Sequence, residues 1–176
     1  SSGVGIFGIQ IAKLYGCTVI ATASPEKLDQ LKELGADYTV DHRKEDWHKE
    51  VFKISKELAK KNNEAPGIDV IFEHIGGSHF NKELTLLKYG ATIVTTGATT
   101  GYDAPADLRH IFFKGINILG STQGTRAELE DGFYWMGQGK IKVIIDSEYT
   151  FENAVDAHNK MLNGKGLVGK IILKPE

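Results

Sequence analysis

The most constraining stretch of the chain is a glycine repeat that runs directly into an apolar segment. Gly3, Gly5 and Gly8 have the spacing G-x-G-x-x-G, and residues 9–14 continue as a largely apolar run. In this pattern the first glycine makes a tight turn, the second lets backbone approach a pyrophosphate, and the third permits close helix–strand packing. The stretch therefore predicts a phosphate-binding loop followed by a helix, whose unpaired N–H groups and positive dipole end attract an anion.

Beyond this stretch, short apolar runs alternate with helical patterns. The expected strands are residues 17–23, 38–40, 68–73, 91–96 and 116–121. Regular alternation of strands and helices is typical of a doubly wound parallel sheet with right-handed crossovers. The strand that should precede the glycine repeat is missing, and the sequence does not begin with methionine. We therefore expect an α/β fold without its first strand, in a fragment of a longer protein.

Three local expectations follow from the same patterns. Cys17 stands at the start of an apolar strand, so we expect it to be buried packing rather than a reactive thiol. Tyr89 and Gly90 are expected to cap the helix whose buried face carries Phe80, Leu84 and Leu87. From Lys140 the pattern changes to an extended stretch, a helix and a closing strand, which predicts a segment that belongs to a different sheet.

Composition indicates that the binding partner of the protein is a small molecule. The formal net charge is −2 with no basic stripe, which argues against nucleic acid or an anionic membrane. No apolar run reaches the roughly 18 residues of a membrane span, and no signal peptide opens the chain. We expect a cytoplasmic protein. A single cysteine excludes an internal disulfide and a cysteine-based zinc cluster.

Residues that follow the expected strand 17–23 favour NADP(H) over NAD(H). In dinucleotide folds an acidic residue about 20 positions past the first glycines binds the ribose 2′-hydroxyl, but residues 21–24 contain no carboxylate. Ser24 offers a hydroxyl and Lys27 an ammonium suited to a 2′-phosphate. The alternative is that Ser24 is only an N-cap and Lys27 a solvated lysine. His42 and Arg43 could close over the same phosphate, or Arg43 could pair with Asp46.

Two later strand ends are rich in small and polar residues, where open α/β sheets bind ligands. One contains His74 and Gly76, and the other contains Gly97 and Ala98. Small residues there let backbone approach a ribose and a nicotinamide, although turn chemistry alone would explain Gly76. The sequence does not identify a catalytic residue. His74 is the one candidate, because its imidazole titrates near neutrality, and the alternative is a histidine that is only hydrogen-bonded locally.

Several segments resemble the medium-chain dehydrogenase/reductases. They are residues 2–13, residues 19–24 with Lys27, and residues 34–37, while residues 69–76, 95–101 and 119–121 resemble the zinc-type alcohol dehydrogenase-like branch, which adjoins quinone oxidoreductases and crotonyl-CoA reductase/carboxylases. The resemblance implies a Rossmann nucleotide domain over residues 1–139. It also implies that residues 140–176 return to a catalytic domain whose bulk, with any zinc ligands, lies upstream of Ser1.

The same resemblance implies an activity and an assembly. Hydride would pass between NADPH and a carbonyl, an alcohol or an activated C=C bond, with Gly3, Val4 and Gly5 on the pyrophosphate and Gly97–Ala98 near the nicotinamide. Residues 116–121 would form the edge strand through which two subunits pair. The alternative is a non-catalytic module that binds a dinucleotide or mediates dimerisation.

Overall fold

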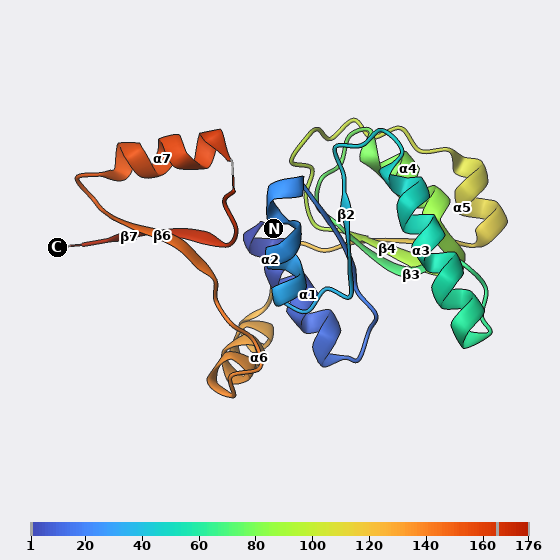
Figure 1. The fold of residues 1–176 in the computed structure, drawn as a ribbon, viewed down its shortest axis with the longest axis horizontal. Coiled ribbons are helices and arrows are strands. Elements are labelled where there is room, and N and C mark those ends of the chain that lie inside the picture. Colours follow the sequence, from blue (N-terminus) through green and yellow to red (C-terminus); the bar gives the residue numbers. More distant parts are fainter. Residues whose placement is uncertain (1, 165, 176) are drawn as a thin grey trace. The chain divides into compact units, whose positions relative to one another are not determined.

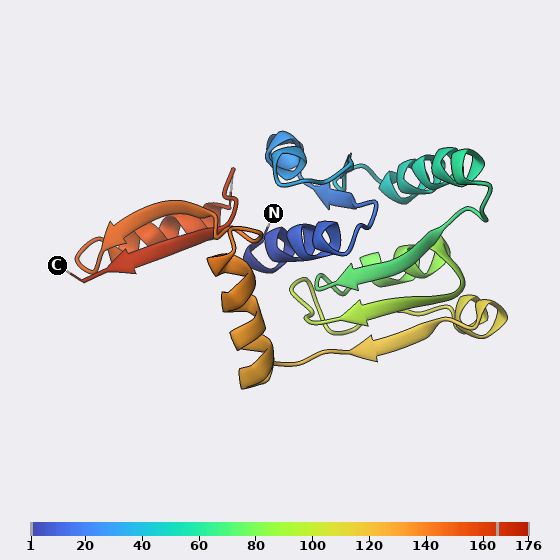
Figure 2. The ribbon, with the colours of Figure 1, turned by 90° about the horizontal axis from the view of Figure 1, so that it is seen from below.

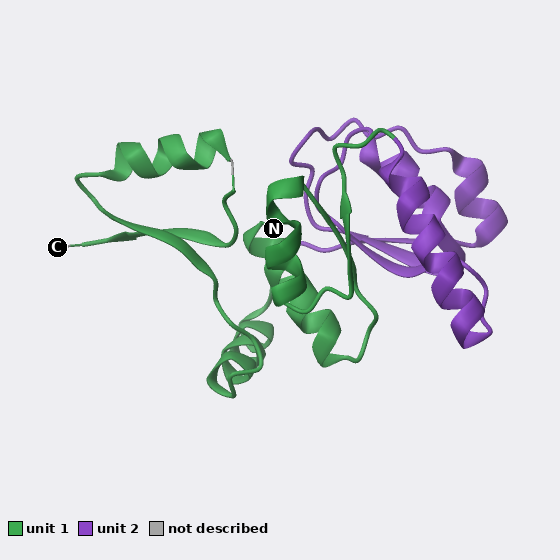
Figure 3. Ribbon diagram, viewed as in Figure 1, with its two compact units in different colours: residues 1–45, 124–176 green, residues 46–123 purple. Residues whose placement is uncertain are grey.

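The computed structural model describes residues 2–164 and 166–175 (Figure 1). The chain divides into two compact units: Ser1–Glu45 with Gly124–Glu176, and Asp46–Gln123 (Figure 3). We call them unit 1 and unit 2 and describe each by itself. None of the helices in the described residues has both the length and the apolar character that crossing a bilayer requires.

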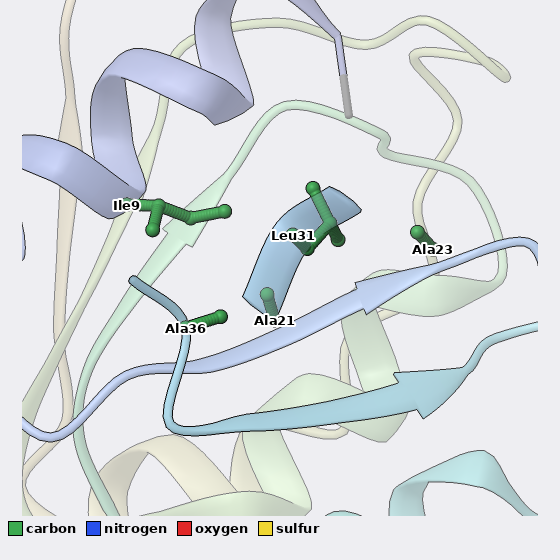
Figure 4. Close-up of a cluster of buried hydrophobic side chains, with 5 residues drawn as sticks. All are labelled: Ile9, Ala21, Ala23, Leu31 and Ala36. Atoms are coloured by element: carbon green, nitrogen blue, oxygen red, sulfur yellow. The ribbon is translucent and has the colours of Figure 1, made fainter. Parts of the chain in front are cut away.

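Unit 1 begins with a helix and a pair of parallel strands. In chain order its first elements are α1 (Gly3–Leu14), β1 (Ile20–Ala23), the 3-10 helix η1 (Pro25–Lys27), α2 (Leu28–Glu33) and β2 (Tyr38–Asp41). Ile20 lies opposite Tyr38 and Ala23 opposite Asp41. Between α1, α2 and the strands lies a small apolar core, which consists of Ile9, Ala21, Ala23, Leu31 and Ala36 (Figure 4).

The C-terminal part of unit 1 forms a sheet of its own. Its elements are α6 (Arg126–Gly137), β6 (Ile145–Thr150), α7 (Ala154–Asn163) and β7 (Lys170–Lys174). The strands β6 and β7 are parallel and pair only with each other, which confirms that the tail belongs to a different sheet. The Gln10 side chain of α1 donates to the carbonyl of Lys142 at 3.0 Å and accepts from its amide at 2.8 Å.

Unit 2 contains a three-stranded parallel sheet whose successive strands are connected along the chain by helices (Figure 2). Its elements are α3 (Trp47–Asn62), β3 (Ile68–Glu73), α4 (His79–Leu86), β4 (Leu87–Thr95), α5 (Leu108–Lys114) and β5 (Asn117–Gly120). The strands lie in the order β3–β4–β5. The core of the unit consists of Leu84, Leu87, Ala91, Ile93 and Ile116.

The predicted α/β architecture with parallel strands is confirmed, but the strands do not form one continuous sheet. β1 pairs only with β2, and β3 pairs only with β4, among the described residues. A doubly wound sheet places its first strand between the two halves. Among the described residues, no strand precedes α1.

The glycine repeat lies inside a helix rather than in a loop before it. Gly3 is already the first residue of α1, because the Ser2 hydroxyl accepts a hydrogen bond from the Gly5 amide at 3.0 Å and caps the helix there. The expected tight turn at Gly3 is therefore wrong. Glycine inside a helix costs about 1 kcal/mol relative to alanine, so its presence at these positions needs another reason, such as close approach of a neighbouring group.

Two further local predictions are wrong. Cys17 is exposed, because β1 begins only at Ile20 and the Cys17 amide instead bonds back to the Ala12 carbonyl at the end of α1. Tyr89 and Gly90 lie within β4, because the helix α4 ends at Leu86 and the chain becomes extended at Leu87. The Lys114 ammonium takes over the capping role, since it donates to the carbonyls of Thr85 at 3.0 Å and Leu87 at 2.8 Å.

A carboxyl group in α4 is buried without a hydrogen-bond partner among the described residues. It is that of Glu83, whose Oε2 atom is enclosed; Trp47 Nε1 and His48 Nδ1 are likewise enclosed and unpaired. Burial, with a smaller contribution from the negative charge of Glu73, raises the pKa of Glu83 to about 8. Glu83 is therefore mainly protonated at neutral pH in the folded protein.

We expect Glu83→Gln to stabilise the protein increasingly as the pH rises. The folded state holds a proton on Glu83 up to a pKa of about 8, whereas the unfolded chain releases it near the ordinary value of 4.5. Folding therefore takes up a proton between these values, and stability falls as the pH rises through them. Glutamine resembles the protonated acid and carries no such cost. Melting temperatures of Glu83→Gln and of the unmodified protein should be measured from about pH 5 to pH 9. The difference between them should grow up to about pH 8 and then stay constant.

The matched control for this prediction is Glu57→Gln, at an exposed position on α3. Its melting curve should follow that of the unmodified protein over the whole pH range. A constant offset between Glu83→Gln and the unmodified protein, with no pH dependence, would contradict protonation of Glu83 on folding.

Candidate functional site

The start of α1 is open to an anion. The helix has 12 residues and no acidic residue in its first turn, and Val4 is 47% exposed. Ser2 satisfies the amide of Gly5, and the amide of Ile6 bonds to the Ser2 carbonyl. The amides of Gly3 and Val4 come too early in the helix to reach an intrahelical acceptor, so they are available to a ligand.

Lys170 of β7 lies against the same end of α1. A Cβ atom placed on Gly3 would collide with the Lys170 side chain, at its Cδ, Cε and Nζ atoms. The absence of a side chain at Gly3 lets this flexible side chain pass close to the helix backbone, so its ammonium lies near the positive end of the helix. The sequence analysis gave Lys170 no role, because 166 residues lie between it and Gly3.

The carboxyl ends of β1 and β2 hold the residues predicted to bind a 2′-phosphate. Ser24 follows β1, is 6% exposed, and makes no side-chain cap to η1. His42 follows β2, and its amide bonds to the Ala23 carbonyl at 3.1 Å, so the two strand ends are adjacent. Lys27 closes η1, and no described residue forms an ion pair or hydrogen bond with its ammonium. The structure thus brings Ser24, Lys27 and His42 to one region.

An acidic side chain also lies in this region. The Arg43 guanidinium pairs with the Glu26 carboxylate at 2.7 Å, so its partner is Glu26, whereas the sequence analysis had considered Asp46. The backbone amide of Glu26 itself, the Ser24 hydroxyl and Arg43 together lower the pKa of Glu26. Glu26 is an acidic residue of this region that the sequence analysis did not consider, because it follows residues 21–24 by two positions.

In unit 2 a buried carboxylate organises the end of β3. Glu73 is 2% exposed, and its Oε1 accepts hydrogen bonds from the amides of Ile75 at 2.5 Å and Gly76 at 2.6 Å. Its Oε2 accepts from the Thr95 hydroxyl of β4 at 3.0 Å. A buried charge is tolerated only when it is hydrogen-bonded in this way. The Gly76 amide is therefore already occupied, so Gly76 can meet a ligand only through its Cα or its carbonyl.

The loops after β3 and β4 pack on each other through glycine. Gly76 has φ +73°, and a Cβ on it would lie 2.5 Å from the Gly101 carbonyl oxygen and 3.1 Å from the Ala98 Cα. A Cβ on Gly97 would lie 3.3 Å from the His74 carbonyl oxygen. Loop packing is thus sufficient to require glycine at position 76, while contact of Gly76, Gly97 and Ala98 with a cofactor stays a prediction.

The backbone of His74 is held by this packing. Its carbonyl accepts a hydrogen bond from the Thr99 hydroxyl at 2.9 Å, and the imidazole lies edge-on to Phe72 with ring centroids 6.1 Å apart. Burial lowers the pKa of His74, so the imidazole is neutral at pH 7 and can both donate and accept a proton. The structure therefore brings His74, Gly76, Gly97 and Ala98 together within unit 2.

Side chains that could bind a metal ion are not clustered in the described part of the chain. Residues 2–164 and 166–175 contain no group of three histidine, cysteine or acidic side chains that could hold a metal ion. Cys17 is exposed and is the only cysteine in the sequence. These residues do not fit a zinc site, so we derive no chemical step through zinc.

Comparison with known proteins identifies the family. Residues 3–138 match the family described as zinc-binding dehydrogenase. The chain belongs to this family, within the medium-chain dehydrogenase/reductases, as the sequence resemblance indicated. The quinone oxidoreductase of Pongo abelii is 32% identical over 98% of this chain and 52% of its own length. The chain spans about half the length of the curated relatives that it matches.

Solved structures agree with the fold. The structure of an NAD-dependent alcohol dehydrogenase superposes with a TM-score of 0.86 at 33% identity, covering 98% of this chain and 48% of that protein. The 2-octenoyl-CoA carboxylase reductase CinF, solved with NADP and 2-octenoyl-CoA, gives a TM-score of 0.83 at 25% identity, covering 98% of this chain and 41% of that protein. Relatives of this kind are thus oxidoreductases that use either nicotinamide cofactor.

We expect Glu73→Ala to destabilise the protein and to loosen both loops of unit 2. The change leaves the amides of Ile75 and Gly76 without their acceptor and leaves the Thr95 hydroxyl only a long hydrogen bond of 3.5 Å to the Gly97 carbonyl. Each unsatisfied buried group costs about 1–3 kcal/mol. Urea unfolding should show a loss of several kcal/mol, and hydrogen exchange at the Gly76 amide should accelerate. Glu73→Gln keeps an acceptor for both amides and should restore most of the lost stability. Equal stability of Glu73→Ala and the unmodified protein would contradict this role.

Proposed function

We propose that the intact protein is an NADPH-dependent oxidoreductase that transfers hydride between the cofactor and a carbonyl, an alcohol or an activated C=C bond. The observation that carries the cofactor assignment is that Lys27 follows Ser24 by one 3-10 turn at the carboxyl end of β1, with no described residue paired to its ammonium. A phosphate monoester has a charge of about −1.5 to −2 at pH 7 and suits this position. The NADP complex of the CinF reductase supports the same choice.

Unit 1 residues bind the adenosine half of the cofactor in this proposal. The amides of Gly3 and Val4, with the backbone of Gly5, receive the pyrophosphate at the positive end of α1, and the Lys170 ammonium adds a cation there. The Ser24 hydroxyl donates to the 2′-phosphate, while Lys27 neutralises it. His42 closes the same region from the end of β2.

Unit 2 residues orient the reactive half. When bound, the nicotinamide supplies or accepts the hydride. The exposed backbone of Gly97 and Ala98 would contact the ring. The absence of a side chain at Gly76 leaves room for the loop that contains Ala98. His74, neutral at pH 7, is the group proposed to hold or move a proton near the substrate. Quinone oxidoreductase and CoA-ester reductase relatives support the activated C=C class, and alcohol dehydrogenase relatives support the carbonyl class.

We further propose that the intact protein forms a homodimer through β5. This strand pairs with β4 on one side only within the described residues, and its Ile118 and Leu119 side chains are 42% and 52% exposed. A free strand edge with exposed apolar side chains is a ready surface for pairing with a second copy.

The cofactor proposal predicts that the intact protein binds NADPH more tightly than NADH, and that Lys27→Ala removes most of the difference. A charge-assisted contact to phosphate is worth about 1.5–3 kcal/mol, so NADPH binding should weaken by about tenfold or more. NADH binding should hardly change, because NADH has no 2′-phosphate. Fluorescence titration of the reduced cofactors measures both affinities.

Lys32→Ala is the matched control. It removes one lysine from the neighbouring helix α2, where the ammonium lies 3.6 Å from Asp29. NADPH affinity should be unchanged in this variant. An equal loss of NADPH and NADH affinity in Lys27→Ala, or tighter binding of NADH by the unmodified protein, would contradict the assignment of the 2′-phosphate to Lys27.

For the dimer, we expect the double variant I118K/L119K to shift the intact protein toward the monomer. Two ammonium groups on the edge strand would face two more across the symmetric contact, and exposed lysines are a common means of blocking edge pairing. Sedimentation velocity over a range of protein concentrations measures the shift. An unchanged dimer in this variant would show that subunits associate through another surface.

A further inference from the structure

The candidate phosphate site contains a charge of the wrong sign. Glu26 lies at the centre of η1, next to Lys27, and its Oε1 is 2.7 Å from Arg43 Nη2. The nearby Ser24 hydroxyl contributes to the lowered pKa of this carboxyl group. One of the groups that could bind a 2′-phosphate, the Arg43 guanidinium, is therefore already paired with Glu26.

A 2′-phosphate and the Glu26 carboxylate would compete for the same partners. Arg43 prefers anions that accept two parallel hydrogen bonds, and both a carboxylate and a phosphate meet this requirement. Binding of the phosphate must displace Glu26 from Arg43 or place two anions side by side. Either event costs free energy, although the side chain of Glu26 is 33% exposed and solvent screens part of the repulsion.

A ribose with a free 2′-hydroxyl meets no such conflict. A carboxylate at the end of this strand accepts hydrogen bonds from ribose hydroxyls in NAD-binding sites. Glu26 has the chemistry to do so while it remains paired with Arg43. The same side chain thus opposes the phosphorylated cofactor and accommodates the unphosphorylated one.

We propose that Glu26 is a specificity-determining residue that reduces discrimination between NADPH and NADH by holding Arg43. This inference rests on the proposed function, because it assumes that a dinucleotide binds at the end of β1. It assigns opposite effects to two neighbouring side chains: Lys27 favours the 2′-phosphate, and Glu26 disfavours it.

The test is Glu26→Gln in the intact protein. Glutamine keeps a side-chain oxygen for Ser24 and Arg43 but removes the negative charge. A partly exposed ion pair is worth up to about 1 kcal/mol, so NADPH should bind about fivefold more tightly. NADH should bind equally well or more weakly. Because the effect is electrostatic, the gain for NADPH should shrink at high ionic strength.

Smaller probes isolate the subsite from the rest of the cofactor. Adenosine 2′,5′-bisphosphate contains the 2′-phosphate, and 5′-AMP lacks it. Calorimetry measures both affinities. In Glu26→Gln, adenosine 2′,5′-bisphosphate should bind more tightly, as NADPH does, and 5′-AMP should bind equally well or more weakly, as NADH does. This readout needs neither the nicotinamide nor catalytic turnover.

Two further variants identify the cause of the change. Asp29→Asn removes one negative charge one helical turn away, at a side chain that is 96% exposed, and should leave the NADPH to NADH ratio unchanged. In an Arg43→Gln background, Glu26→Gln should give a smaller gain for NADPH, because the released guanidinium is no longer present. An equal gain in both backgrounds would contradict the role assigned to Arg43.

The outcomes separate this inference from the proposed function. If the unmodified protein binds neither nucleotide, both fail. If it prefers NADPH and Glu26→Gln leaves the ratio of affinities unchanged, only the role of Glu26 is overturned. The same holds if Asp29→Asn changes the ratio as much as Glu26→Gln does.

Discussion

The interaction on which the larger sheet depends is the burial of the Glu73 carboxylate at the end of β3. This group accepts hydrogen bonds from two consecutive amides and from the Thr95 hydroxyl of the next strand. One side chain therefore shapes the loop after β3 and joins it to β4. The negative charge of Glu73 also affects Glu83. Burial of Glu83, with a smaller contribution from this charge, raises its pKa and keeps it protonated at neutral pH.

In unit 1, the groups proposed to bind a ligand lie at the termini of secondary-structure elements. The Ser2 cap sets the start of α1, and the missing side chain of Gly3 lets Lys170 approach it. The adjacent ends of β1 and β2 gather Ser24, Lys27 and His42.

Much of the fold could be predicted because strand propensity and period are local properties. The strand 68–73 and the changed pattern after Lys140 were correct, since apolar runs of this kind admit few alternatives. Cys17 and Tyr89 were misplaced because helix ends depend on tertiary partners, such as the Lys114 ammonium. At the candidate site, spacing pointed to Ser24 and Lys27, whose role in cofactor binding stays a prediction. Spacing did not point to Glu26 and Lys170, because only contacts in the folded chain bring them to these regions.

The reciprocal bonds between Gln10 and Lys142 join two segments that are far apart in the sequence. A primary amide that both donates to and accepts from one peptide group reproduces the contact between neighbouring strands, so a side chain here substitutes for backbone pairing. The segment after α6 thereby gains a strand-like partner from a helix, and shortening this one side chain would remove both hydrogen bonds at once.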